Sequence, residues 1–200
     1  MFPGEQCNGR IGSNRRQDQG RSVNWITETE SGWLSREDMD LARERLPVVY
    51  VDVVPVRVDS LGQVSAVGLL LRARHDGSIS RSLVSGRVLY GERIREAILR
   101  HVEKDLGSMA LPQLPASPSP FTVAEYFPDP QVSGYHDTRQ HAVSLAYVVP
   151  VTGDCAPSSD ALDLAWASPA EAVSTAVQLE MTGGQDRLVR LALASCGMLP

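Results

Sequence analysis

The valine-rich segment Val48–Asp59, with the sequence VVYVDVVPVRVD, places the strongest constraint on the fold. Its β-branched residues favour an extended strand, because they pack well on a pleated surface. The polar stretch Ser60–Gln63 predicts a turn, and VSAVGLLLRAR from Val64 predicts a second strand. A further tight turn is predicted at His75–Gly77, before the segment SISRSLVSGRVL. The sequence therefore predicts a β-meander in this part of the chain.

A helical pattern follows the meander directly. Apolar residues recur at helical spacing at Ile94, Ala97, Ile98 and Val102. This spacing predicts an amphipathic helix from about Glu92 to Leu106, and Gly107 is a typical residue for ending it.

The rest of the chain supplies more strands and helices. Ser35, followed three residues later by Asp38, predicts the start of a lead-in helix that Pro47 stops after about Arg45. Strands are predicted in FTVAEYF, HAVSLAYVVPV and ALDLAW, helices in SPAEAV and GQDRLVRLALASCG, and a surface loop in LPQLPASPSPF. Elements in this order predict an α+β fold, a mixed sheet sandwiched by helices.

Composition sets the expected organisation and excludes some partners. Residues 1–30 predict a disordered tail, residues 31–47 the lead-in helix, and residues 48–200 a single domain.

The net charge of -5 speaks against a nucleic-acid partner, because binding a phosphate backbone needs a basic surface. The three cysteines are widely spaced and lack a CxxC pair, so we expect reduced thiols in a cytoplasmic protein. No apolar run approaches the roughly 18 residues of a membrane span, so no membrane partner is expected.

The segment Gly86–Gly107, GRVLYGERIREAILRHVEKDLG, resembles the signature of the Nudix hydrolases. That signature is a Gly, five residues, a Glu, seven residues, then Arg-Glu, an apolar residue, any residue, Glu-Glu, any residue and Gly. Its Gly, Glu, Arg, apolar and Gly places are occupied in register by Gly86, Glu92, Arg100, Val102 and Gly107. The strand pair before the segment and DLAWASPAEAV after it also resemble the family. The resemblance covers about residues 45–196 and extends to uncharacterised bacterial Nudix-related proteins.

The resemblance implies a metal-binding face on the helix. Helix positions i, i+1, i+4 and i+5 share one face, so four residues point toward the same site: Arg100, His101, Lys104 and Asp105. In the family this face carries three carboxylates that bind Mg²⁺, and the metals clamp a diphosphate and activate water. Here His101 and Lys104 take the first two places, which implies a degenerate signature with Mg²⁺ held by Asp105. Glu92 is expected mainly to orient Arg100 or the adjacent loop.

Lys104 is the only lysine among the 19 basic residues of the chain. Two unit charges about 4 Å apart interact by roughly 4 kcal/mol at an effective dielectric near 20, so an ammonium in place of a carboxylate strongly disfavours a metal cluster. Lys104 could hold a phosphate directly as a point charge. It could equally be solvated, as most charged helix residues are.

The same segment has a partial likeness to GDP-mannose mannosyl hydrolases. The GRV, GE and DLG elements match that branch, which retains the last acid of the signature, here Asp105. Enzymes of this branch resemble hydrolases that use a single metal ion and in which water attacks the sugar carbon. Their Gln-His pair just ahead of the Trp strand is not matched.

The loop Gly134–His141, GYHDTRQH, lies where Nudix enzymes often keep substrate or base residues. A neutral histidine can act as a general base, and we predict that role for His141. His136 and Arg139 are predicted to bind substrate. The alternative is that these residues anchor the loop through hydrogen bonds to its backbone.

The leading hypothesis from the sequence is a Nudix-type hydrolase of a nucleoside diphosphate linked to another group, such as a sugar. The alternative is a catalytically silent Nudix-fold module that binds a nucleotide or a protein. A small-molecule nucleotide is the expected ligand, and the resemblance also allows a homodimer. The predicted catalytic residues are Glu92, Asp105 and His141, with Asp105 as the metal ligand. The predicted substrate-binding residues are Arg87, Arg100, Lys104, His136 and Arg139.

Overall fold

A long strand, β1 (Val48–Val58), lies at the centre of the sheet in the computed structural model, which describes residues 34–73, 77–157 and 161–198. The predicted tail (residues 1–30) and most of the predicted turn at residues 75–77 lie outside the described residues. On one side β1 pairs in parallel with β7 (Ala142–Pro150). On the other side its first half pairs with β4 (Val84–Arg87) and its second half with β2 (Val64–Ala73). The partner of β1 on this side therefore changes from β4 to β2 midway along the strand.

Eight strands of the described chain form one mixed sheet. Its main order is β3-β2-β1-β7-β5-β6, with β4 on β1 and β8 on β2. The outer strands are β3 (Ile79–Ser82), β5 (Thr122–Phe127), β6 (Tyr135–His136) and β8 (Asp163–Ala167).

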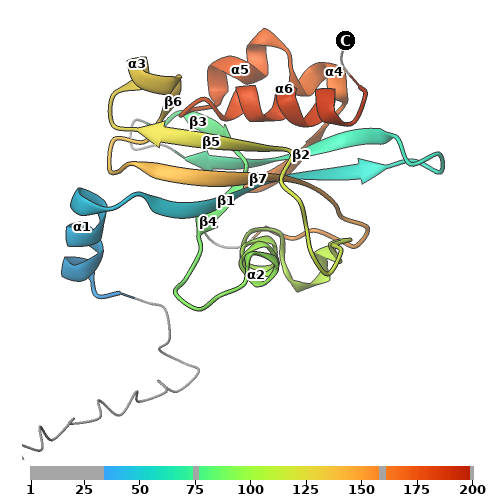
Figure 1. The fold of residues 1–200 in the computed structure, drawn as a ribbon. Helices are drawn as coiled ribbons and strands as arrows, with labels where there is room; N and C mark the ends of the chain where they lie inside the picture. The colour runs from blue at the N-terminus through green and yellow to red at the C-terminus, as the bar shows by residue number, and fades with distance from the viewer. Residues whose placement is uncertain (1–33, 74–76, 158–160, 199–200) are drawn as a thin grey trace, which may run out of the picture. The chain divides into compact units, whose positions relative to one another are not determined.

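Helices cover both faces of this sheet (Figure 1). On one face lies α2 (Ile94–Leu106), followed by a short 3-10 turn at Ser108–Ala110. The opposite face carries α4 (Pro169–Ala172), α5 (Thr175–Glu180) and α6 (Gln185–Ser195). The predicted α+β sandwich is thus confirmed. None of the helices in the described segments combines the length and apolar character that a bilayer crossing requires.

Residues of β1 contribute in alternation to two separate hydrophobic cores. Val51 and Val53 pack with Ile98 and Val102 of α2. Val54 and Val56 belong to the second core, which also holds Leu69, Leu188, Val189 and Leu193. Since strand side chains alternate between faces, the valine run can support both layers of helices at once.

The structure differs from the sequence-based expectation at three places. The helix α2 begins at Ile94, two residues after Glu92, because the Glu92 carboxylate accepts the Leu89 backbone N–H within the preceding turn. The last segment of the predicted meander, SISRSLVSGRVL, forms two strands, β3 and β4, and between them the Leu83 N–H donates to the Gln185 side chain. The helices α5 and α3 (Pro130–Ser133) and the short strand β6 were not predicted.

Candidate functional site

A cationic pocket lies beside α2 and β4, and we call it the α2 pocket. Its volume is about 550 Å³, and its cationic lining residues are Arg72, Arg87, Arg100, Lys104 and Arg139. Among the described residues that line it, none is Asp or Glu. The other lining residues are mainly hydroxyl-bearing or apolar: Tyr50, Ser82, Leu83, Ser85, Gly86, Leu89, His101 and Gln185. The pocket is therefore suited to an anion.

Glu92 and Arg100 clamp the turn before α2 onto the helix. The Arg100 Nε lies 2.6 Å from Glu92 Oε1, and its Nη2 lies 2.8 Å from Oε2. The same Nη2 donates to the Arg87 carbonyl at 2.9 Å. Burial pushes the pKa of Glu92 upward, but the hydrogen bonds from Arg100 and Leu89 outweigh it, and the pKa is lowered. Glu92 is thus a carboxylate that orients Arg100 and the turn.

His101 forms part of the wall where the family places its first carboxylate. The ring is 7% exposed, and its Nε2 lies 3.0 Å from the Arg87 carbonyl. A carbonyl can only accept, so Nε2 carries the proton and the buried Nδ1 is an acceptor without a partner among the described residues. Burial lowers the pKa of His101, which favours the neutral ring. A Cβ at Gly86 would collide with this ring, so the first glycine of the segment makes room for His101.

Asp105 lies behind the pocket wall, paired with a residue from β2. It is 2% exposed and does not line the α2 pocket. The Arg72 guanidinium lies 3.5 Å from its Oδ2, while no described residue bonds to its Oδ1. Burial raises the pKa of Asp105, although the charges of Arg72, Lys104 and His101 oppose the shift. Arg72 therefore neutralises the one carboxylate that remains on this face of α2.

This arrangement does not fit a Mg²⁺ cluster held by carboxylates. A hard cation prefers several oxygen ligands, and within the described segments no group of three His, Cys, Asp or Glu residues could hold a metal. A single ion at Asp105 would compete with Arg72 for the same carboxylate.

A second pocket adjoins the α2 pocket on the side of α6, and we call it the Asp52 pocket. Its volume is about 340 Å³. It shares five lining residues with the α2 pocket: Tyr50, Ser82, Ser85, Arg139 and Gln185. Its own lining residues include Asp52, Tyr126, His136, Thr138 and Thr182. The two pockets therefore form neighbouring compartments with a common wall.

Asp52 is a buried carboxylate in the middle of β1. It is 1% exposed, and the Tyr126 hydroxyl donates to its Oδ2 at 3.0 Å. Burial raises the pKa of Asp52, and the nearby hydroxyls of Ser85, Ser144 and Tyr126 oppose the shift. Neither serine has the geometry of a hydrogen bond to Oδ1, which has no partner in the described part of the chain.

The predicted site residues of the loop Gly134–His141 lie in different pockets. His136 lines the Asp52 pocket, with its Nδ1 3.1 Å from the Phe127 carbonyl, and Arg139 lines both pockets. Asp137 holds Arg139 through two contacts of 2.9 Å. Burial alone would raise the pKa of Asp137, but the hydrogen bonds from Arg139 lower it. His141 stacks on Phe127 and lines a separate hollow beside α1 rather than either pocket.

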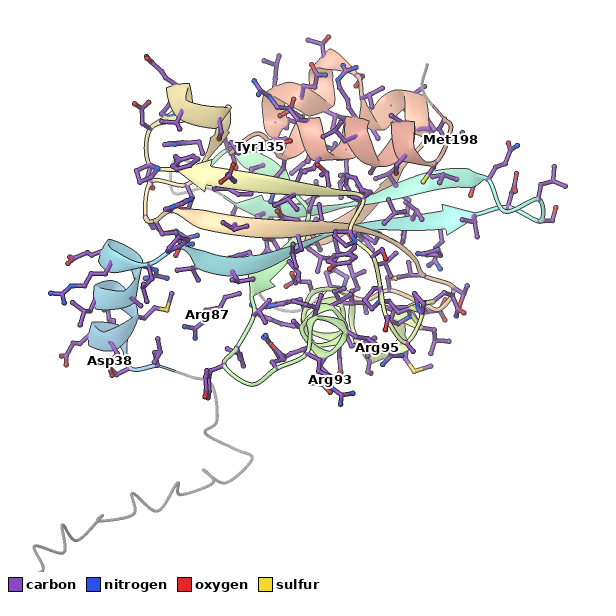
Figure 2. The ribbon with its side chains drawn as sticks, in the orientation of Figure 1. Asp38, Arg87, Arg93, Arg95, Tyr135 and Met198 are labelled. Atoms are coloured by element: carbon purple, nitrogen blue, oxygen red, sulfur yellow. The ribbon has the colours of Figure 1, made fainter. Side chains whose placement is uncertain are left out.

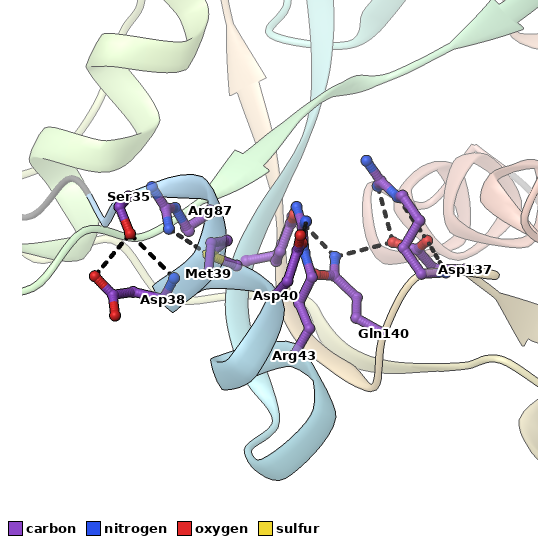
Figure 3. Close-up of polar contacts among 10 residues, drawn as sticks. Ser35, Asp38, Met39, Asp40, Arg43, Arg87, Asp137 and Gln140 are labelled. Carbon is purple, nitrogen blue, oxygen red and sulfur yellow. Dashed lines mark hydrogen bonds and ion pairs between the residues drawn. The ribbon is translucent and has the colours of Figure 1, made fainter.

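The lead-in helix α1 (Arg36–Arg45) contacts residues of the α2 pocket (Figure 3). Ser35 caps it by accepting the Asp38 backbone N–H, as the sequence predicts. The Arg87 guanidinium, which extends toward α1 in Figure 2, donates to the sulfur of Met39.

A chain of hydrogen bonds also connects α1 with Arg139. Arg43 Nε donates to the Gln140 side chain at 3.0 Å. Gln140 in turn donates at 2.9 Å to the Tyr50 hydroxyl and at 2.9 Å to Asp137, the partner of Arg139. Gln140 is only 2% exposed, so this chain is a buried link between α1 and the wall that the two pockets share.

The fold is that of the Nudix hydrolases, as the sequence resemblance implied. A Caenorhabditis elegans Ap4A hydrolase in a binary complex is 13% identical, with a TM-score of 0.54 over 75% of this chain and 98% of that chain. The Nudix domain of Shewanella oneidensis NrtR in complex with ADP ribose is 16% identical, with a TM-score of 0.54 over 81% of this chain and 99% of that chain. At these identities the similarity is one of fold.

Within this fold class the chain belongs to the family described as a domain of unknown function (DUF4916), whose model matches residues 29–198. A crystal structure from Jonesia denitrificans DSM 20603, described as a possible asymmetric diadenosine tetraphosphate (Ap4A) hydrolase, is 60% identical to it. That similarity covers 78% of this chain and 98% of the other, with a TM-score of 0.76. No curated protein matches the chain.

Sequence reasoning missed Asp52 and Arg72. Asp52 carried a signal, since it is a lone acidic residue within the apolar strand Val48–Val58. Arg72 carried none, because its pairing with Asp105 arises only when β2 packs beside α2.

Proposed function

We propose that the protein is a Nudix-type hydrolase of a nucleoside diphosphate linked to another group. The observation that carries the proposal is the α2 pocket, whose lining has five cationic residues and, among the described residues, no carboxylate. A diphosphate is a compact anion, and cationic side chains can replace its hydration shell with charge-assisted hydrogen bonds.

The cations of the pocket have different roles in this proposal. Arg100 is paired with Glu92, so it holds the turn and adds positive charge to the pocket wall. Lys104 occupies the family's second carboxylate position and supplies a point charge on the same helix face. Arg87 and Arg139, tethered to α1 and Asp137, flank the ligand from the other side. Together they would neutralise the phosphate charge and fix its orientation.

The roles predicted for the acidic and histidine residues receive unequal support. Glu92 lies where it orients Arg100 but does not line the pocket. Asp105 would have to exchange Arg72 for a metal ion or a substrate group before it could act. His141 lies in the hollow beside α1, whereas His136 lines the Asp52 pocket next to the proposed diphosphate position. His136 is thus the better-placed histidine for contact with the ligand.

Hydrolysis is the part of the proposal that rests on relatives. The Jonesia denitrificans protein, described as a possible asymmetric Ap4A hydrolase, is similar over most of both chains. Ap4A is therefore the first substrate to assay, followed by ADP ribose and nucleotide sugars.

One observation favours a second candidate, a catalytically silent Nudix-fold module. His101 and Lys104 occupy two of the family's three acid positions and Arg72 neutralises the third acid, Asp105, which suits binding better than metal-assisted turnover. Such a module would hold the same ligand without cleaving it.

A turnover assay separates the two candidates. The purified chain is incubated with Ap4A, ADP ribose and a nucleotide-sugar panel, with Mg²⁺ or with a chelator, and products are resolved by chromatography. The hydrolase proposal predicts product from at least one compound. An absence of product from every compound, together with a ligand-induced rise in the melting temperature, would establish the silent module instead.

Two variants test the role of Asp105 in the same assay. Asp105→Asn should reduce turnover at least tenfold if the carboxylate takes part, whereas Glu103→Gln should leave it unchanged. Glu103 is a suitable control because it is an exposed carboxylate on α2 outside the pocket. Full turnover by Asp105→Asn would remove Asp105 from the catalytic residues.

A further inference from the structure

The unpartnered oxygen of Asp52 points to a ligand group that the cationic pocket does not explain. Asp52 is 1% exposed and lines the Asp52 pocket, and its buried Oδ1 has no hydrogen-bond partner in the described residues. Burying a polar atom without a partner is costly, so such atoms call for an occupant or a functional reason. A ligand that supplies a donor to Oδ1 would remove this cost.

The two oxygens of the Asp52 carboxylate differ in their hydrogen bonds. The Tyr126 hydroxyl donates to Oδ2 at 3.0 Å, and burial together with Asp52 raises the pKa of Tyr126, so that hydroxyl stays protonated. Oδ2 therefore already has one donor, whereas Oδ1 has none among the described residues. A single N–H or O–H donor from a ligand would give Oδ1 a partner without disturbing the bond from Tyr126.

The remainder of the Asp52 pocket suits a neutral polar ring. Its lining brings the hydroxyls of Ser85, Thr138 and Thr182 near Asp52, and the cations Arg72 and Lys104 line only the α2 pocket. The two other charged residues of the lining, Asp137 and Arg139, pair with each other. The His136 Nδ1 faces the Phe127 carbonyl and is thus the protonated nitrogen, which leaves Nε2 as an acceptor. Hydroxyls and acceptors in this combination match the N–H and O–H groups of a nucleobase or a sugar.

The common wall allows one ligand to occupy both pockets. Tyr50, Ser85 and Arg139 line each of them, so a chain of atoms can pass from the cationic α2 pocket into the Asp52 pocket. A volume of about 340 Å³ is at the lower end of the range of small-molecule sites, about 300–1,000 Å³, and is sufficient for a single ring.

We propose that the Asp52 pocket is the subsite for the uncharged ring of the ligand and that Asp52 Oδ1 accepts one hydrogen bond from that ring. The inference rests on the proposed function, since the α2 pocket must hold the diphosphate of the same molecule. The ring is the nucleobase or the sugar, which share this donor chemistry. Asp52 is then a specificity-determining residue.

Calorimetric titrations of wild type and Asp52→Asn test the proposal with defined probes. The probes are inorganic pyrophosphate, then ADP, GDP and UDP, then UDP-glucose. Asparagine keeps the shape of Asp52 and can still accept from Tyr126, but it presents an N–H to the pocket. We expect the tightest nucleotide to bind about tenfold to a hundredfold more weakly to Asp52→Asn, with pyrophosphate binding unchanged. A loss already present with nucleoside diphosphates identifies the base, and a loss confined to UDP-glucose identifies the sugar.

Methylated or deoxygenated ligands repeat the test on the wild-type protein, so the result does not depend on how the variant folds. UDP methylated at N3, GDP methylated at N1, or a deoxy-sugar nucleotide lacks the donor and should bind about tenfold to a hundredfold more weakly than its parent. Glu125→Gln is the matched control, because it removes an exposed carboxylate outside both pockets and should preserve the preference for the unmodified ligand.

Distinct outcomes overturn the inference and the proposed function. The subsite is overturned if nucleotides bind wild type no more tightly than pyrophosphate does. It is also overturned if nucleotides bind wild type and Asp52→Asn with equal affinity. Neither result contradicts the diphosphate pocket. An equal loss of pyrophosphate affinity in Asp52→Asn also overturns it, since Asp52 would then act on the whole site. Wild type that binds neither pyrophosphate nor any nucleotide overturns the proposed function and the inference with it.

Discussion

The α2 pocket and the Asp52 pocket share a wall but differ in how the chain builds them. The α2 pocket draws much of its charge from one continuous stretch, because Arg87, Arg100 and Lys104 all lie within residues 86–107. The Asp52 pocket collects Asp52 from β1, Tyr126 from β5 and Thr182 from the segment before α6. One compartment is therefore encoded locally and the other by tertiary structure.

The two compartments also differ in how their charges are balanced. In the α2 pocket the cations line the surface, while the carboxylates that hold them, Glu92 and Asp105, lie behind it. In the Asp52 pocket a carboxylate itself lines the surface, and a tyrosine holds its far oxygen. The first arrangement presents positive charge and the second presents an acceptor, so the pair suits a ligand with an anionic part and a neutral part.

The largest expected effect comes from Gly86→Ala, which tests the His101 wall of the α2 pocket. The added Cβ would collide with the buried His101 ring, and overpacking of this kind costs about 2–3 kcal/mol in the free energy of unfolding. Urea denaturation followed by circular dichroism measures the change.

A double-mutant cycle supplies the control for Gly86→Ala. In a His101→Ala background the ring is absent, so the same substitution should cost less than about 0.5 kcal/mol. An equal cost in both backgrounds would show that the ring of His101 does not require the glycine.

A smaller effect is expected from Gln140→Met, which tests the wall that both pockets share. Methionine fills a similar space but cannot donate to Asp137 and Tyr50 or accept from Arg43. Removing these hydrogen bonds between a buried side chain and its half-buried partners should lower the free energy of unfolding by about 1–3 kcal/mol. Thermal and urea denaturation measure the loss.

Arg43→Met is the matched comparison for Gln140→Met. It removes the same chain of hydrogen bonds at its α1 end, where the side chain is partly exposed, so the cost should be below about 1 kcal/mol. If Gln140→Met were as stable as wild type, the buried link between α1 and Arg139 would not contribute to the structure.

Local patterns predict the elements and the cationic face, but not the pairing of those cations. These patterns depend only on residues that are close in sequence: the valine run, the turns, and the helical spacing of Ile94, Ala97, Ile98 and Val102. Helical periodicity predicts that Asp105 points toward the same site as Lys104, but in the structure Lys104 lines the α2 pocket and Asp105 does not. The periodicity cannot reveal that Arg72 of β2 reaches Asp105 and holds it behind the wall.

The Gly134–His141 loop shows the same limit. Its polar composition predicts a functional or anchoring loop, and Arg139 and Asp137 indeed hold each other there. That His136 faces the Asp52 pocket while His141 stacks on Phe127 depends on the pairing of β6 with β5, which the short strand sequence does not signal. Asp52 could have been identified, because a lone carboxylate in an apolar strand needs a physical reason.

The cations of the α2 pocket are proposed to bind a diphosphate directly, without a metal ion. Isothermal titration with inorganic pyrophosphate in the presence of a chelator tests it most directly, using wild type, Lys104→Gln and Arg95→Gln. Arg95 lies on the same helix but outside the pocket, where it donates to the Pro115 carbonyl, so it controls for the loss of one charge. If the cations bind pyrophosphate directly, Lys104→Gln weakens binding about tenfold and Arg95→Gln leaves it unchanged. Equal affinity in wild type and Lys104→Gln, or an equal loss in both variants, would contradict this proposal.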